Sequence, residues 1–250
     1  MTDPSPAGPQ AQSSTTARLE AFSDGVTAIA ITLLVIEIGV PEVGHDDLWD
    51  ALVEQWPSYA AFLISFAVIG IMWVSHHAMF ERIATVDRGL LFLNLALLMG
   101  IAFVPFPTAL LAEYVREGGA NSHVAAAIYS AVMALIGLAF VGMWRHLLRN
   151  PHLLVAGIPR ERIEVAIKKS MVGPVVYGAS IGLAFISALA CLFVYALVAL
   201  YFAGNPSSRV ATPGSHGADA SRKQAPAKKS SAKKAPAKKS SAKKSSAKRS

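Results

Sequence analysis

The chain has 250 residues, of which 53% are hydrophobic and only 16% are charged. Soluble domains carry about 25% charged residues, so this composition argues against a protein that has water as its main solvent. The charge is unevenly placed: 13 of the 23 basic residues and a single acid follow Ala203, which leaves 10 basic and 15 acidic residues before it. The sequence therefore predicts an apolar, slightly acidic body and a strongly basic tail.

The N-terminal segment is rich in Pro, Ser and Thr and lacks the basic start and cleavage site of a secretory signal. A segment of this composition buries too little apolar surface to fold by itself. We therefore expect residues 1–17 to form a disordered arm.

Six apolar runs follow the arm, and each approaches or exceeds the roughly 20 helical residues that a bilayer core requires. They are residues 22–40, 57–79, 90–111, 124–148, 165–184 and 186–203. The last two can also be read as one long helix, but two helices that turn near Ser187 fit better if the fifth begins near Ile163. We predict an all-α, polytopic membrane protein with six transmembrane helices within residues 18–203.

The charges of the connecting loops test this count, because Lys and Arg concentrate on the cytoplasmic side of a membrane. With the N-terminus inside, the second and fourth loops and the tail are also inside, and all three are basic. The basic residues of these two loops are Arg82, Arg88, Arg145, Arg149, Arg160, Arg162, Lys168 and Lys169. We therefore expect a multi-pass protein of the cell membrane with cytoplasmic N- and C-termini.

The tail repeats units such as PAKKSSAKK and carries no large apolar side chain after residue 224. It cannot bury enough surface to fold, so we expect residues 204–250 to be disordered. A basic run of this kind can bind anionic lipid or nucleic acid by releasing counterions, or can act as a solubilising extension without a fixed partner.

The most informative motif lies at the start of the first apolar run, where Arg18-Leu19-Glu20-Ala21-Phe22-Ser23-Asp24 precedes a long hydrophobic segment. Asp24 is an ionisable group at the beginning of that helix. A carboxylate in this position can simply cap the helix, because it accepts hydrogen bonds from unpaired N–H groups and favours the positive helix end. The alternative is a functional or network-forming residue.

The spacing Arg-x-x-x-Phe-Ser-Asp resembles the motif of the transmembrane protein 175 family, which includes the lysosomal potassium channel and its bacterial relatives. The residues that match it are Arg18, Phe22, Ser23 and Asp24. The resemblance continues through AIAITLLVIEI, a His-His pair after Trp73, and the Leu-Asn-Leu and Pro-Phe-Pro-Thr segments of the third run. It implies a potassium channel made of four identical subunits, whose first helices line a central pore.

The resemblance also implies roles along the first helix. Ile29 matches the hydrophobic constriction and Thr32 a polar layer linked to potassium preference, while Leu33 and Ile36 match further pore-lining positions. Their spacing places all four on one helical face, although an ordinary packing stripe has the same spacing. A narrow apolar neck can gate by dewetting. The chain contains no TVGYG segment, so we expect only modest selectivity.

Polar residues of the second and third helices are expected at the depth of the motif. Buried polar groups in a membrane need partners, so we predict a hydrogen-bonded network behind the pore helix. Its expected members are Ser23, Asp24, Trp73, His77 and Asn94. The family resemblance favours a structural role for this network, and a proton relay is the alternative.

We expect neither a cofactor nor a metal site. Adjacent helical residues such as His76 and His77 point about 100° apart, and no third ligand is evident. The chain also lacks the motifs of the common enzyme classes. Two alternatives to a channel remain open: a proton-coupled secondary transporter, and a membrane anchor whose tail binds nucleic acid or anionic lipid.

Overall fold

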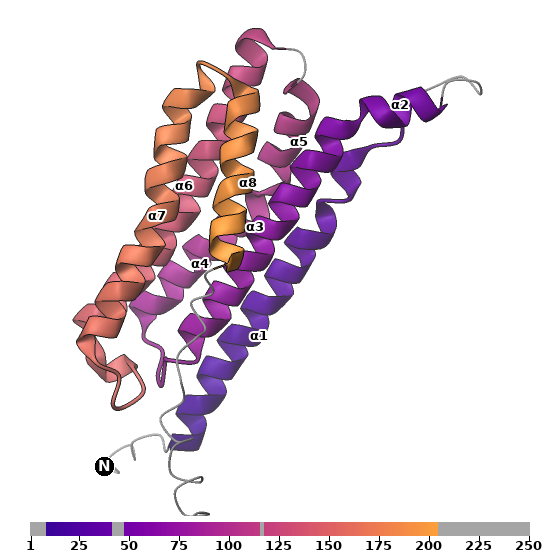
Figure 1. Cartoon of the computed structure of the whole chain (residues 1–250). Helices are drawn as coiled ribbons and strands as arrows, with labels where there is room; N and C mark the ends of the chain where they lie inside the picture. Colours follow the sequence, from indigo (N-terminus) through magenta and orange to yellow (C-terminus); the bar gives the residue numbers. More distant parts are fainter. Residues whose placement is uncertain (1–8, 42–47, 116–117, 205–250) are drawn as a thin grey trace, which may run out of the picture. The chain divides into compact units, whose positions relative to one another are not determined.

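The computed structural model describes residues 9–41, 48–115 and 118–204, and the structural statements below refer to these residues. The described chain is almost entirely helical (Figure 1). Its elements are α1 (Pro9–Leu33), η1 (Ile36–Ile38), α2 (Leu48–Glu54), α3 (Trp56–Phe80), α4 (Arg88–Phe103), α5 (Pro105–Tyr114), α6 (Gly119–Arg149), η2 (Pro151–Leu153), α7 (Arg160–Ala184) and α8 (Ala188–Gly204).

Helix α1 begins earlier than the apolar run predicts. A proline fits the first helical turn, because its fixed φ suits the helix and its missing N–H has no helical partner there. The helix starts at Pro9, so the second half of the predicted arm is helical. The predicted tail lies outside the described residues except for Gly204, and the predicted division into arm, channel domain and tail stays a prediction.

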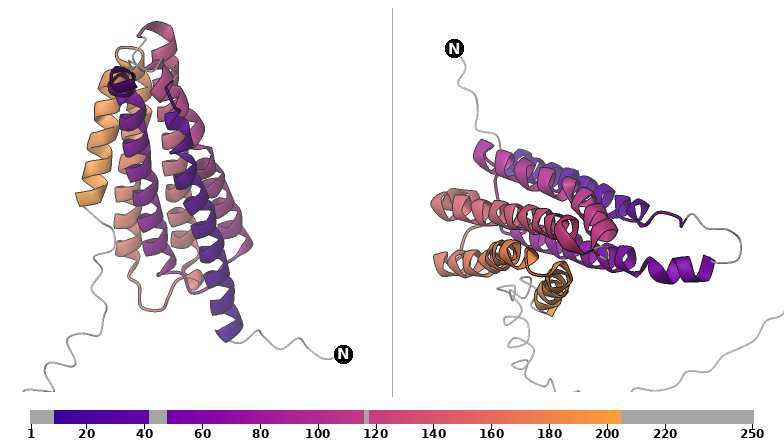
Figure 2. Two further views of the ribbon diagram at one scale, coloured as in Figure 1. Left: turned by 90° about the vertical axis from the view of Figure 1, so that its right-hand side faces the viewer. Right: turned by 90° about the horizontal axis from the view of Figure 1, so that it is seen from above.

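The long helices lie side by side in a bundle whose core is built mainly from α3 to α8. Helix α6 packs along most of α7 and also contacts α4, α5 and α8. The close approach of α6 and α7 depends on Gly137, because a Cβ atom there would lie 2.6 Å from the Pro174 ring. Helix α1 contacts α3, α4 and α5 and lies at one side of the bundle (Figure 2).

Four helical segments are long and apolar enough to cross a membrane: Thr15–Ile38, Trp56–Phe80, Arg88–Tyr114 and Gly119–Arg149. Helix α8 is apolar but has only 17 residues, and α7 carries charged residues over its first ten. At 1.5 Å per residue α8 extends about 26 Å, slightly less than a bilayer core. The two helices turn at residues 185–187, as predicted. The all-α membrane class is confirmed, whereas the count of six spans stays a prediction.

The third apolar run is divided into α4 and α5 by two prolines. Pro105 and Pro107 have no N–H, so they cannot donate to the carbonyls of the preceding turn. The helix is interrupted at Val104, whose N–H bonds to Ile101 at 3.1 Å. The break lies beside the end of α1 and leaves room for a cavity there.

The loop after α3 and the loop after α6 are tied together at the end of the bundle where α1 begins (Figure 1). Ala84 N–H donates to the Leu153 carbonyl at 2.8 Å. Asp87 caps α4 by accepting from the Leu90 N–H at 2.8 Å, and both of its oxygens lie 2.9 Å from His146 Nε2. We call the Asp87 and His146 pair the loop latch. It joins the start of α4 to the end of α6, where Arg88, Arg145 and Arg149 also lie.

Candidate functional site

Helix α1 has one face packed into the bundle and one face that is largely exposed in the subunit. The packed face consists of Ser23, Thr27, Ala30 and Leu34, each at most 6% exposed. On the opposite face Ile29 is 62% and Ile36 is 68% exposed. The other residues of this open face are Phe22, Thr32 and Leu33. A contiguous apolar surface of this kind marks a contact with another protein chain, lipid or ligand.

Asn94 on α4 holds the packed face of α1 in place. Its Nδ2 group donates to the Ser23 hydroxyl at 3.0 Å, and its Oδ1 accepts from His76 Nε2 at 2.8 Å. The Ser23 hydroxyl donates in turn to the Leu19 carbonyl. The side chains of Ser23, His76 and Asn94 are all at least 96% buried, and we call them the polar anchor. It connects α1, α3 and α4 and satisfies polar groups that would otherwise be costly at this depth.

The anchor uses His76 where the sequence led us to expect His77. His77 instead faces α1, where its Nδ1 lies 2.8 Å from Glu20 Oε1. Adjacent helical residues point about 100° apart, so only one of the two can face Asn94. Because the two histidines face different helices, they are not placed to share a metal ion.

Asp24 lies four residues after Glu20 on α1 and likewise pairs with a residue of α3. Trp73 donates its indole N–H to Asp24 Oδ1 at 2.9 Å, and the Trp73 and His77 rings stack with centroids 5.9 Å apart. Asp24 is far inside a helix that begins at Pro9, so the interpretation of Asp24 as a helix cap is wrong. Arg18, the first residue of the motif, is exposed on the same helix.

Thr32 is the one polar residue of the open face. Its hydroxyl donates to the carbonyls of Ala28 and Ile29 at 3.0 and 2.9 Å. A hydroxyl has one proton and two lone pairs, so this arrangement uses the proton on the helix and leaves oxygen lone pairs for another partner. The exposed oxygen can therefore accept a hydrogen bond or contact a cation.

The sequence comparisons decide the family. Residues 18–105 match the family model described as the endosomal/lysosomal potassium channel TMEM175. A protein of Streptomyces collinus that is named a potassium channel is 51% identical over 201 residues, which are 78% of this chain and 97% of that relative. This chain belongs to the TMEM175 family. The family resemblance inferred from the Phe-Ser-Asp motif is thereby confirmed, and the chain is a multi-pass membrane protein of a family of ion channels.

Other TMEM175 relatives cover most of this chain as well. A potassium channel of Chamaesiphon minutus is 44% identical over 195 residues, covering 77% of this chain and 95% of the relative. A crystal structure described as a lysosomal potassium-selective channel TMEM175 homolog from the same organism superposes with a TM-score of 0.69 and 41% identity. The superposed region covers 79% of this chain and 100% of the chain in the crystal structure. A human relative is named an endosomal/lysosomal proton channel and is 28% identical over 181 residues, covering 70% of this chain and 34% of the relative.

The predicted network left out two residues that the structure places in these contacts, His76 and Glu20. Two equal spacings in the sequence could have indicated that Glu20 pairs with His77. Glu20 and Asp24 are four residues apart on α1, and Trp73 and His77 are four residues apart on α3. Residues four apart share a helix face. In helices that run in opposite directions, Glu20 then faces His77 when Asp24 faces Trp73. No corresponding sequence signal distinguished His76 from His77 as the partner of Asn94.

Proposed function

We propose that this protein is a potassium-preferring cation channel in which four subunits each contribute α1 to a central pore. The observation that carries this proposal is the open face of α1, which exposes Ile29 and Ile36 while the polar anchor fixes the opposite face. A pore helix requires this combination of a rigid back and an uncovered front. The names of the bacterial relatives support potassium as the permeant ion.

Ile29 is the proposed constriction. Four isoleucine side chains around one axis would form a short apolar neck that cannot replace the hydration shell of an ion, and such a neck gates by dewetting. Potassium loses its hydration shell at lower cost than sodium, so a neck that strips water from the ion favours potassium. Leu33 and Ile36 extend the apolar wall toward the end of α1.

Thr32 is the proposed polar layer beside the neck. Its hydroxyl proton is used on the α1 backbone, so the lone pairs of four Thr32 oxygens would face the ion path. A ring of oxygens next to an apolar neck offers a partly dehydrated cation a place to rest. Selectivity in this arrangement depends on the spacing of the four helices, which the anchor helps to fix.

Single-channel recording of the purified protein in planar bilayers tests the proposal, with potassium on one side and sodium on the other. We expect the wild type to prefer potassium and Thr32→Ser, which keeps the hydroxyl, to behave similarly. Thr32→Ala should lower the permeability ratio about two- to fivefold, as expected for losing an oxygen contact worth about 0.5–1 kcal/mol. An unchanged ratio in Thr32→Ala would exclude Thr32 from the ion path.

A proton channel is the second candidate, because the human and chicken relatives are named proton channels. The same recordings distinguish the two under a pH gradient with symmetrical potassium. A reversal potential that follows the proton gradient favours proton permeation, and one that stays at zero favours potassium. A proton-coupled transporter would produce current only with its co-substrate present.

We further propose a location in the cell membrane with both termini in the cytoplasm. The basic residues at the end of the bundle that holds the loop latch support this orientation, and they are Arg82, Arg88, Arg145, Arg149, Arg160 and Arg162. The 13 basic residues of the tail would then lie on the anionic face of the membrane. Binding of this tail to anionic lipid or nucleic acid is part of the proposal, and the residues concerned lie outside the described structure.

A further inference from the structure

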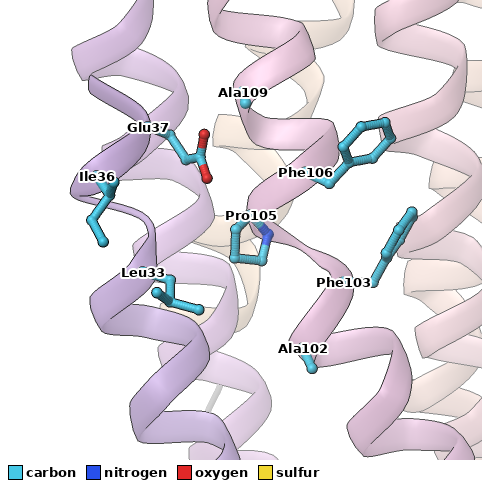
Figure 3. A pocket seen from close by; sticks show the side chains of 8 residues that line it. All are labelled: Leu33, Ile36, Glu37, Ala102, Phe103, Pro105, Phe106 and Ala109. Carbon is cyan, nitrogen blue, oxygen red and sulfur yellow. The ribbon is translucent and has the colours of Figure 1, made fainter. Parts of the chain in front are cut away.

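A cavity of about 330 Å³ opens between the end of α1 and the α4–α5 break (Figure 3). Seven of its eight lining residues are apolar and one is a glutamate. The residues on which the inference depends are Leu33, Ile36 and Glu37 on one side, and Ala102, Pro105 and Ala109 on the other. Small-molecule sites have volumes of roughly 300–1,000 Å³, so the cavity is large enough for a small organic ligand.

The electrostatics of the cavity favour a positive ligand. Glu37 is the one charged residue among those that line it, and Figure 3 shows its carboxylate turned toward Pro105 and Ala109. Helix α1 ends at Leu33, and the carboxyl end of a helix carries a partial negative charge. Both features attract cations, and none of the described residues that line the cavity is a Lys, Arg or His that would offset them.

The composition of the walls favours an organic cation over a metal ion. A bare potassium or calcium ion replaces its hydration shell with several oxygen ligands, whereas Glu37 supplies the single oxygen-bearing side chain here. An alkylammonium ion matches the cavity better. Its charged end pairs with the carboxylate, and its carbon chain covers Leu33, Pro105 and Ala109.

We propose that this cavity is a binding site for free alkylammonium ions with a short apolar chain, which enter from the end of the bundle where α1 stops. The volume is too small for a lipid with two acyl chains, so the occupant is a soluble amine. Binding at this site is distinct from ion conduction, because it requires only the cavity and Glu37.

Binding is measured by saturation-transfer NMR and calorimetry on the full-length protein in phosphatidylcholine nanodiscs, with hexylammonium as the probe and 1-hexanol as its neutral counterpart. We expect hexylammonium to bind more tightly than hexanol. Glu37→Gln should weaken hexylammonium about fivefold, the upper range for a solvent-accessible ion pair, and leave hexanol unchanged. Ala109→Leu fills the cavity and should abolish binding of both, and Ala102→Leu repeats this test if Ala109→Leu does not assemble.

Glu113→Gln is the matched control, because it removes an exposed carboxylate of α5 that does not line the cavity. We expect it to bind hexylammonium as the wild type does. Equal losses in Glu37→Gln and Glu113→Gln would overturn the site in favour of a general surface potential. Equal affinity for hexylammonium and hexanol, or a retained phospholipid that mass spectrometry detects and that excludes the amine, would also overturn it.

A second readout rests on the proposed function. Leu33 and Ile36 border both the cavity and the proposed pore wall, so bound hexylammonium should reduce the current, and Glu37→Gln should relieve the reduction. Binding without any effect on current retains the site and counts against the pore assignment of Leu33 and Ile36. A third outcome would overturn the cavity site. If hexylammonium still reduces the current fully in Glu37→Gln and Ala109→Leu, although neither variant binds it measurably, the amine acts in the ion path instead.

Discussion

Ile29 combines a large apolar side chain with a 62% exposed position on α1. If it forms the neck, shortening it should ease hydration of the passing ion. We expect Ile29→Ala to raise single-channel conductance about two- to fivefold, which corresponds to a barrier lowered by about 0.5–1 kcal/mol. Ile31→Ala, a similar truncation of a half-buried α1 residue outside the open face, should leave conductance unchanged. Unaltered conductance in an assembled Ile29→Ala channel would contradict the assignment.

Asn94 is fully buried and is the only one of the three anchor residues bonded to both others. Replacing it by Ala leaves the Ser23 hydroxyl and the His76 ring without their partner. We expect Asn94→Ala to lower the stability of the assembled protein by about 1–2 kcal/mol, the range for interhelical hydrogen bonds in membranes. Thermal inactivation monitored by size-exclusion chromatography measures this loss. The control is Leu95→Ala on the exposed side of α4, and an equal loss there would show that the anchor has no special role.

At the scale of the helices, the loop latch connects the start of α4 to the end of α6. Burial tends to raise the pKa of the Asp87 carboxyl, but the Leu90 N–H and His146 outweigh it and hold that pKa below its ordinary value. A depressed carboxyl pKa stabilises the folded protein above the ordinary value near 4 and loses this contribution as pH falls through the folded value. The contribution of the Asp87 charge to the latch should therefore be lost as pH falls through this lowered pKa.

Two substitutions of Asp87 separate its contribution as the N-cap of α4 from the contribution of its negative charge. Asp87→Ala should destabilise the protein by about 1 kcal/mol, because the α4 N-cap is lost. Asp87→Asn keeps a cap acceptor and should cost less at pH 7. Denaturation of reconstituted protein at pH 7 and below pH 4 measures the difference between wild type and Asp87→Asn, which we expect to disappear in acid. A difference that is the same at both pH values would show that the Asp87 charge does not contribute.

At the scale of the whole molecule, we expect the helices to be independent of the basic tail. Among the described residues, the last one in the buried core is Ala199, and α8 ends at Gly204. We expect deletion of residues 206–250 to leave the oligomer assembled and conducting, as measured by light scattering and bilayer recording. Loss of current on deletion would show that the tail takes part in the channel itself.

The full-length protein in nanodiscs should bind duplex DNA or anionic lipid at low salt and release it as salt rises, whereas the truncated protein should not. Counterion release makes such binding strongly salt-dependent. Binding by the full-length protein that ignores salt concentration would contradict an electrostatic tail.

The sequence by itself determined that this protein lies in a membrane, that it is helical and that it belongs to the TMEM175 family. Long apolar runs leave a backbone in lipid no choice but the helix, because every N–H and C=O must find a partner within the segment. The turn near Ser187 and the family motif were likewise predictable, since turns and short motifs are encoded by neighbouring residues. Pro9 was overlooked as a helix start, although a proline suits that position.

The tertiary structure alone decided how the helices are rotated against one another. Rotation selects His76 over His77 as the partner of Asn94, pairs Glu20 with His77, and places Asp24 against Trp73 instead of at a helix end. It also brings the end of α1 beside the α4–α5 break, where the cavity and Glu37 meet. These side-chain contacts join residues 18 to 71 positions apart on different helices, so they depend on the packing of whole helices, which local sequence patterns do not encode.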